Sequence, residues 1–287
     1  MAQNTTKASR KADIDISVLV PVMNEAGNIR PLIDEIVAAM AGRDFEIIYI
    51  DDASTDATAD ELADCQRAIP QLRVMRHAQR AGQSAALRSG LLATKGHLIA
   101  VLDGDGQNVP SDLPALEAAL LADYPDRGMA AGIRQKRKDS ALKLQASRIA
   151  KWIRKCLLGD THPDSWCGIK ILHRDLFIEL PFFNHMHRFM PSLVRRHGGG
   201  VTGVAVAHRA RTQGQSKYQV LDRLVVGISD IIGVIWLLKR APRHGAVAEI
   251  AAPEGRAPKK SAPKGRAPKK SAPKKPTPKR QSVKKGA

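Results

Sequence analysis

Cysteine is scarce in this sequence, and its residues are widely spaced. Cys65, Cys156 and Cys167 form no Cys-x-x-Cys pair, which argues against a disulfide framework and against a thiolate zinc site. This usage fits a protein of a reducing compartment. The first 15 residues also lack an apolar segment, so we do not expect a secretory signal peptide.

The chain contains no long hydrophobic run. Its longest apolar stretch, residues 224–238, is interrupted by Ser229 and Asp230. Because a bilayer requires about 20 predominantly apolar residues, we do not expect this stretch to span a membrane. With Trp236 near its end and basic residues after it, the stretch fits two alternatives. It is either a membrane-interfacial helix with a basic rim or a helix packed on the rest of the protein.

Most of the positive charge lies at one end of the chain. The formal net charge is +18, and residues 251–287 contribute +12 of it through 13 Lys and Arg residues and one acidic residue, Glu254. The sequence GRAPKKSAPK fills residues 255–264 and again residues 265–274. Frequent proline and the lack of large apolar side chains predict a disordered tail over residues 241–287. Such a tail can bind an anionic membrane surface or, without sequence specificity, nucleic acid.

Short apolar runs alternate with helical patterns between residues 16 and 240. This alternation predicts an α/β fold with a mostly parallel, twisted sheet flanked by helices. The runs at 18–20 and 47–50 are apolar on both faces, as buried parallel strands are. The polar residues 1–15 are expected to be disordered. We expect strands at 16–22, 45–50, 72–76 and 98–102, and helices at 28–40, 58–67, 84–93, 140–158 and 220–239.

Two acidic clusters follow predicted strands. Residues 51–56 read DDASTD, and residues 103–107 read DGDGQ. Asp103 and Asp105 can offer hard oxygen ligands to Mg²⁺ or Mn²⁺, which commonly bind carboxylates together with substrate phosphates. Either cluster alone can also be explained by turns and helix caps. Two clusters at strand ends favour a functional site, because ligands bind at the carboxyl edge of such sheets.

Several motifs carry a resemblance to a known family. Residues 21–25 read PVMNE, and with the two acidic clusters they resemble the inverting family-2 glycosyltransferases of the A-type glycosyltransferase fold. Within that family the chain is most similar to the group of dolichyl-phosphate mannose synthase and bacterial polyprenyl-phosphate glycosyltransferases. Further matches occur in the family's order at residues 80–86 (RAGQSAA), 164–168 (DSWCG) and 211–218 (RTQGQSKY). The predicted catalytic domain therefore covers residues 16–240.

The resemblance implies an enzyme that moves a sugar from a nucleotide diphosphate to a polyprenyl phosphate, giving a polyprenyl monophosphosugar. It implies that Asp103, Asp105 and Gln107 hold a divalent cation, Mg²⁺ or Mn²⁺. Catalysis would depend on Asp103 and Asp105 and on Arg211 and Lys217, since fixed cations stabilise a departing diphosphate. Without the motif, Arg211 and Lys217 would be interpreted as solvated surface residues. The residues implied for binding the nucleotide sugar are Pro21, Asn24, Glu25, Asp52, Arg211 and Lys217.

Basic residues suggest where the acceptor binds. Arg134 precedes a predicted helix on which Lys143 and Ser147 share a face, next to Arg148. This set is either a cradle for a monoester phosphate, similar to the acceptor region of polyprenyl-phosphate enzymes, or an ordinary basic helix face. A phosphate with a second pKa of about 6 is ionised at neutral pH, whereas a sugar hydroxyl usually needs a general base. Asp164 is the reserve candidate for that base, whereas the resemblance implies that it orients the acceptor region.

Alternative functions differ in their sequence requirements. Family members with saccharide acceptors tend to carry a Glu-Asp or Gln-x-x-Arg-Trp signature, which is absent here, so a phosphate acceptor is favoured. A nucleotide-sugar pyrophosphorylase needs a glycine-rich basic loop after the first strand, and residues 21–25 do not provide one. A nucleic-acid-associated role through the tail stays open as an accessory activity. His185, His187 and His208 are expected near the site in structural roles, and the protein is expected to be cytoplasmic and peripheral to the inner membrane.

Overall fold

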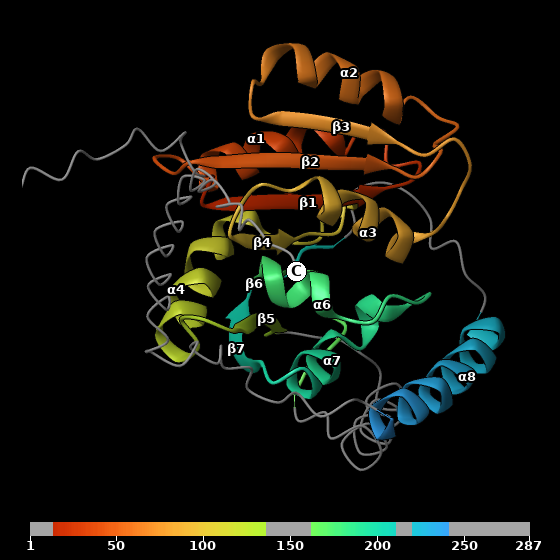
Figure 1. The fold of residues 1–287 in the computed structure, drawn as a ribbon. Coiled ribbons are helices and arrows are strands. Elements are labelled where there is room, and N and C mark those ends of the chain that lie inside the picture. The colour runs from red at the N-terminus through yellow and green to blue at the C-terminus, as the bar shows by residue number, and fades with distance from the viewer. Residues whose placement is uncertain (1–13, 136–161, 211–219, 241–287) are drawn as a thin grey trace, which may run out of the picture. The chain divides into compact units, whose positions relative to one another are not determined.

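A seven-stranded sheet runs through the computed structural model (Figure 1), which describes residues 14–135, 162–210 and 220–240. The strand order is β3-β2-β1-β4-β6-β5-β7. β6 is antiparallel to both of its neighbours, and every other neighbouring pair is parallel. The predicted mostly parallel sheet is therefore confirmed. The strands are β1 (Ile16–Val22), β2 (Phe45–Asp51), β3 (Leu72–Arg76), β4 (Leu98–Val101), β5 (Gly128–Arg134), β6 (Lys170–His173) and β7 (Gly200–Val206).

Helices cover both faces of the sheet, and the side chains of each strand alternate between two cores. Val18 and Ile47 belong to the core on one face, whereas Leu19 and Ile48 belong to the core on the other. Burial on both faces explains why these strands read as continuous apolar runs. The helices are α1 (Ile29–Ala39), α2 (Thr58–Ala68), α3 (Gln83–Ala93), α4 (Leu113–Asp123), α6 (Arg174–Glu179), α7 (Met190–Arg196) and α8 (Val220–Lys239), with short 3₁₀ helices η1 (Pro110–Asp112) and η2 (Met186–Arg188).

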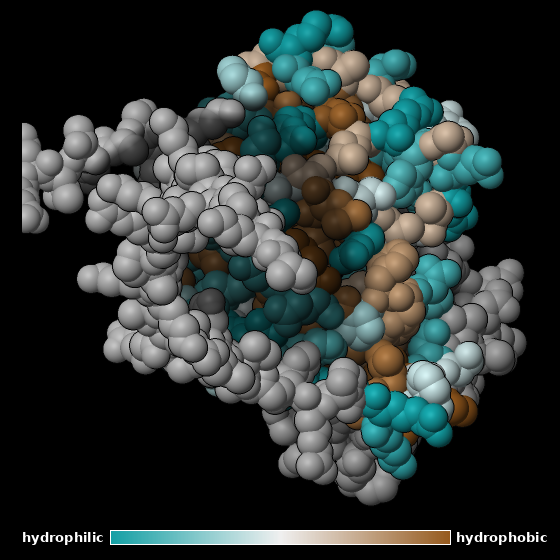
Figure 2. All heavy atoms as spheres, in the orientation of Figure 1, coloured by the Kyte–Doolittle hydropathy of each residue, from teal (hydrophilic) through white to brown (hydrophobic). Residues whose placement is uncertain are grey.

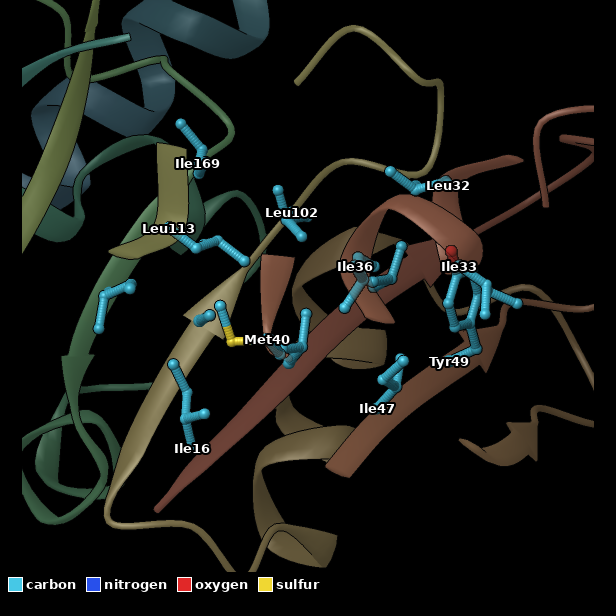
Figure 3. Close-up of a cluster of buried hydrophobic side chains, with 14 of the residues drawn as sticks. Ile16, Leu32, Ile33, Ile36, Met40, Ile47, Tyr49, Leu102, Leu113 and Ile169 are labelled. Atoms are coloured by element: carbon cyan, nitrogen blue, oxygen red, sulfur yellow. The ribbon is translucent and has the colours of Figure 1, made fainter. Parts of the chain in front are cut away.

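The first core lies between the sheet and helices α1, α2 and α4. In α1, Leu32, Ile33 and Ile36 recur at helical spacing and are buried, and Figure 3 shows them close to Tyr49 and Ile47 of β2. The outer surface at the top of Figure 2, over α2, is hydrophilic. The period of the apolar residues therefore orients these helices on the sheet. The second core lies beneath α3, α6, α7 and α8.

Most of the predicted elements before residue 102 agree with the structure to within one or two residues. β2 extends one residue further than predicted, and β4 ends one residue earlier. The sequence patterns did not resolve α4, β5, β6, α6, α7 or β7. The predicted helix over residues 140–158 and the predicted disorder of residues 1–13 and 241–287 lie outside the described residues.

Helix α8 shows features of both predicted alternatives. Val234 is buried in the second core, and Ile231 and Ile235 pack against that core. On the other side, Ile232 is 62% exposed and Trp236 is 57% exposed. The helix therefore packs on the protein through one face and presents apolar side chains on the other. No helix within the described ranges is both long enough and apolar enough to cross a bilayer.

Candidate active site

The ends of β1, β2 and β4 meet at one edge of the sheet. The register pairs Val22 with Asp51 and Leu19 with Val101. β5 runs in the same direction, and the antiparallel β6 begins at this edge. The loops that follow the parallel strands therefore bring the predicted residues of separate segments together, where open α/β sheets bind ligands.

The turn after β1 is held by the loop after β2. Asn24 adopts a left-handed conformation, with φ of 55°, which asparagine tolerates better than most residues. Its backbone N–H donates to Ser54 Oγ at 2.9 Å, and its side-chain oxygen accepts from the Thr55 N–H at 2.8 Å. The Glu25 N–H donates to Thr58 Oγ1 at 2.8 Å. Asn24 and Glu25, both predicted to bind the nucleotide, are thus fixed to the segment after β2 and form one side of this edge.

Asp52 is 4% exposed and accepts three hydrogen bonds. Its Oδ1 accepts from the Ala81 N–H at 2.8 Å and lies 2.8 Å from His77 Nδ1, and its Oδ2 accepts from the Gly82 N–H at 2.7 Å. Burial acts to raise the pKa of Asp52, but these hydrogen bonds outweigh it and hold the pKa below its ordinary value. Gly82 has φ of 93° at the start of α3. Asp52 therefore fixes the turn that starts α3.

The loop of residues 103–107 follows β4. Asp103 Oδ1 accepts from Gln83 Nε2 at 2.9 Å, and Asp105 Oδ1 accepts from the Gln107 N–H at 3.2 Å. Burial, and then the charge of Asp105, raise the pKa of Asp103. Gly104 packs against β1, because a Cβ there would lie 2.3 Å from a methyl group of Val22 and 3.2 Å from the oxygen of Pro21.

The chemistry of this loop fits a divalent cation. Burial is the main cause of the raised pKa of Asp103 and the charge of Asp105 is the second, and a divalent cation bound at this loop would offset both. No group of three or more His, Cys, Asp or Glu side chains with metal-binding geometry occurs within the described ranges. The two carboxylates and the amide of Gln107 offer fewer ligands than a closed metal site, which would suit a cation that takes its other ligands from phosphates and water.

Arg134, at the end of β5, is paired with Asp164. Its Nε donates to Asp164 Oδ2 at 2.6 Å and its Nη2 to Asp164 Oδ1 at 2.8 Å. The side chains of Arg134 and Asp164 are only 17% and 11% exposed, so this bidentate pair is a fixed part of the edge. That Arg134 binds the acceptor stays a prediction. Lys143, Ser147 and Arg148 lie outside the described residues.

The segment after β7 crosses the 103–107 loop. The backbone N–H of Arg209 donates to the backbone oxygen of Gln107 at 3.0 Å. In return, Gln107 Nε2 donates to the backbone oxygen of Arg209 at 3.3 Å. The guanidinium of Arg209 donates to both oxygens of Glu35 on α1, at 2.9 and 2.6 Å. The chain is thus anchored at Arg209 beside Gln107, one of the predicted cation ligands. Arg211 and Lys217 themselves lie outside the described residues.

Two of the histidines near the site, His185 and His187, have hydrogen-bond partners. His187 Nδ1 lies 2.9 Å from Ser84 Oγ on α3, and burial, assisted by Arg188 and Lys170, lowers the pKa of His187 to about 3. It is therefore neutral at physiological pH. His185 Nδ1 lies 2.9 Å from Asp230 Oδ2 and so connects α8 to the loop before η2. Burial lowers the pKa of His208, which feels the charges of Arg134 and of nearby carboxylates.

Several contributors were not identified from the sequence. Gln83, His77 and Arg209 hold predicted site residues, which are Asp103, Asp52 and Gln107, through long-range hydrogen bonds. Gly168 allows the chain to pass over Asp103, because a Cβ there would lie 2.1 Å from Asp103 Oδ2. The only available signal was that Gln83 and Gly168 fall within the motifs at 80–86 and 164–168. The motifs indicated that Gln83 and Gly168 belong to functional segments, but not that both would contact Asp103.

Comparison with known sequences places the chain in a family. The family model described as "Glycosyl transferase family 2" matches residues 17–180. A dodecaprenyl-phosphate galacturonate synthase of Rhizobium johnstonii is 31% identical over 245 residues, which cover 81% of this chain and 70% of that protein. An undecaprenyl-phosphate 4-deoxy-4-formamido-L-arabinose transferase of Edwardsiella ictaluri is 29% identical over 209 residues, covering 72% of this chain and 63% of that protein. The chain thus spans about two thirds of the length of these relatives.

Solved structures share the fold. Glucosyl-3-phosphoglycerate synthase of Mycobacterium tuberculosis in complex with Mn²⁺, UDP and glucosyl-3-phosphoglycerate superimposes with a TM-score of 0.61 at 21% identity, over 82% of this chain and 83% of that chain. The same enzyme in complex with Mg²⁺ and UDP gives a TM-score of 0.58 at 25% identity, with the same coverage. The predicted A-type glycosyltransferase fold is confirmed.

Proposed function

The chain belongs to glycosyl transferase family 2, and from this premise we propose that it transfers a sugar from a nucleotide diphosphate to a polyprenyl phosphate, with inversion. The convergence of Asn24, Asp52 and the 103–107 loop at the carboxyl edge of the sheet carries this proposal. The product is a polyprenyl monophosphosugar for the modification of cell-envelope glycans or glycolipids. The names of the curated relatives, which act on dodecaprenyl and undecaprenyl phosphates, support this acceptor class.

A divalent cation, Mg²⁺ or Mn²⁺, is proposed at Asp103, Asp105 and Gln107. When bound there it would neutralise charge on the donor diphosphate. Gln83 keeps Asp103 oriented through the 2.9 Å hydrogen bond to its Oδ1. Pro21, Asn24, Glu25 and Asp52 would form the nucleoside side of the site. Solved relatives of the same fold contain Mn²⁺ or Mg²⁺ together with UDP, which supports this arrangement.

Arg211 and Lys217 are proposed to bind the donor diphosphate as it leaves. The structure supports the first part of this assignment, because Arg209 is fixed to Gln107 and to Glu35. Because Arg211 is only two residues further along the chain, we propose that its side chain reaches the donor diphosphate at the 103–107 loop. A cation in that position stabilises negative charge that develops during departure of the nucleoside diphosphate.

The acceptor is proposed to be a phosphate that needs no general base. The carboxylate of Asp164, the reserve base, is engaged by both Nε and Nη2 of Arg134, and such a pair holds the carboxylate in its ionised, hydrogen-bonded form. We assign Asp164 to positioning Arg134, with Lys143, Ser147 and Arg148 completing a cradle for the lipid phosphate. A saccharide acceptor is the alternative, and it would require a base elsewhere.

Membrane contact is proposed through two elements. On α8, Ile232 and Trp236 are exposed, and the guanidinium carbon of Arg240 lies 5.3 Å from the Trp236 ring centroid. An apolar stripe beside a basic residue suits a bilayer interface. The basic tail would add attraction to anionic lipids, with nucleic-acid binding as its alternative. We therefore propose a cytoplasmic enzyme that is peripheral to the inner membrane.

One experiment tests the reaction. The protein is incubated with radiolabelled UDP- or GDP-sugars, polyprenyl phosphate and Mg²⁺ or Mn²⁺, and the lipid is extracted. We expect radiolabel in the extracted lipid. Mild acid should release this label as free sugar, whereas alkali should leave the phosphate linkage intact. Transfer to saccharides with no labelled lipid would establish the alternative acceptor class. No transfer from any nucleotide sugar to either acceptor would refute the proposed reaction.

A further inference from the structure

Lys170 is a buried lysine at the edge of the sheet that carries the site. It is 4% exposed and is the first residue of β6. The antiparallel register pairs it with Val101 of β4 and with Ala131 of β5. These two strands lead directly to Asp103 and to Arg134. Because β6 is antiparallel to β4 and β5, it starts where they end. Lys170 therefore lies between the end of β4, which leads to Asp103, and the end of β5, which carries Arg134.

A short chain of contacts joins Lys170 to Asp103. The Lys170 ammonium donates a hydrogen bond to the Cys167 oxygen. The next residue, Gly168, packs against the carboxylate of Asp103, because a Cβ there would lie 2.1 Å from Asp103 Oδ2. With ordinary bond lengths along this path, the ammonium lies within about 10 Å of that carboxylate.

The charges around Lys170 are of both signs. Asp103 and Asp164 act on it as anions, and Arg134 acts as a cation. Burial lowers the pKa of Lys170, while Cys167 and then the carboxylates of Asp103 and Asp164 act in the opposite direction. A buried cation is costly unless it is paired and hydrogen-bonded. The proposed reaction assigns Lys170 no direct contact with either substrate, so its placement needs another explanation.

We propose that Lys170 is a built-in countercharge of the cation site, which makes divalent-cation binding depend on the nucleotide. Its fixed positive charge balances Asp103 and Asp164 before ligands arrive and repels a cation that enters the 103–107 loop alone. A nucleoside diphosphate brings enough negative charge to overcome that repulsion. Lys170 is thus a positioning residue that acts through Asp103. This inference rests on the proposed function, because both the cation and the nucleotide are part of that proposal.

The size of the effect follows from Coulomb's law. A single and a double positive charge about 10 Å apart repel each other by an amount that depends on the effective dielectric constant, which lies between the values of water and of the protein interior. Removal of the ammonium should therefore tighten binding of Mn²⁺ to the nucleotide-free protein by about tenfold. Binding of Mn²⁺ in the presence of UDP should change much less, since the ammonium also attracts the diphosphate.

The test measures Mn²⁺ affinity by electron paramagnetic resonance, with and without UDP or GDP. The proteins are the full chain, Lys170→Met, Lys170→Arg, and Lys95→Met as a control. Lys95 is exposed and precedes β4 at the opposite edge of the sheet. We expect tighter nucleotide-free binding in Lys170→Met alone, and wild-type affinity in Lys170→Arg and in Lys95→Met.

The outcomes separate this inference from the proposed function. Unchanged or weaker nucleotide-free binding in a folded Lys170→Met protein would overturn the countercharge role, even with normal transfer activity. If that variant does not fold, Lys170→Gln, which removes the charge and keeps an N–H donor for the Cys167 oxygen, replaces it in the same measurement. Failure of the wild type to bind Mn²⁺ even with UDP and GDP would instead refute the proposed cation.

Discussion

Replacement of Asp52 by asparagine tests whether the hydrogen bonds of its buried carboxylate stabilise the fold around the site. Its carboxylate accepts from the N–H groups of Ala81 and Gly82 and contacts His77, at 2.7 to 2.8 Å. Asparagine offers one acceptor oxygen, so an NH₂ group must face at least one of these donors. Leaving a buried donor unsatisfied costs about 1–3 kcal/mol, and loss of the charge adds to this. We expect the free energy of unfolding to fall by about 2–3 kcal/mol.

Urea denaturation at neutral pH measures this loss, with Asp34→Asn as the matched control. Asp34 pairs with Arg30 on the surface of α1, where both side chains are more than half exposed, so the same chemical change should cost about 0.5 kcal/mol or less. The melting temperature should fall by about 4–10 °C in Asp52→Asn. Equal stabilities of the two variants would show that the hydrogen bonds of Asp52 are not important for the fold.

The loss should also depend on pH in a defined direction. The fold lowers the pKa of Asp52, so its charged form is stabilised relative to the unfolded chain. That stabilisation is fully present above the unfolded pKa of about 3.9 and disappears as the pH falls through the folded value. The stability gap between wild type and Asp52→Asn should therefore narrow in acid. A gap that stays constant below about pH 3 would contradict this argument.

Three further predictions concern the cation, the acceptor and the membrane. Asp105→Ala should abolish transfer and change the free energy of unfolding by about 1 kcal/mol or less. Full activity of that variant, or of the wild type in excess EDTA, would disprove the cation assignment. Lys143→Ala and Ser147→Ala should raise KM for polyprenyl phosphate more than KM for the nucleotide sugar, and parallel changes would exclude the phosphate cradle. Trp236→Ala and deletion of residues 251–287 should each weaken co-sedimentation with anionic vesicles, and high salt should remove only the contribution of the tail. A preference for DNA over vesicles would reject the membrane role of the tail.

The sequence predicted the part of the protein in which strand and motif coincide. Strands such as 16–22 and 45–50 are apolar on both faces, and this single property determines their burial, their direction and the edge at which the following loops meet. The sequence therefore predicts Asp103 at the same edge of the sheet as Asn24 and Asp52, and the strand register agrees. Strand β6 was not predicted, because four residues beginning with a lysine carry no apolar alternation.

The contacts that hold the site together could not be predicted in the same way. The bond from Gln83 to Asp103 spans 20 residues, that from Arg209 to Glu35 spans 174, and each depends on packing of several elements. Asp52 illustrates the limit well. The family motif implies that Asp52 lines the nucleoside pocket, but it does not reveal that the carboxylate of Asp52 also accepts from two N–H groups of the turn before α3. A motif identifies a residue that matters, but hydrogen bonds over such separations decide what it touches.

The two halves of the site are built by different means, and this has a consequence for specificity. The donor half rests on consecutive parallel strands whose ends are fixed by the sheet register, as in the pairing of Val22 with Asp51. The proposed acceptor half depends on β6, which reverses direction, and on an ion pair between Arg134 and Asp164. The 103–107 loop is constrained by its proposed cation and by the close packing of Gly104 against Val22. Changes in acceptor should therefore arise by substitution around Arg134 and Asp164, while the residues of the 103–107 loop stay as they are.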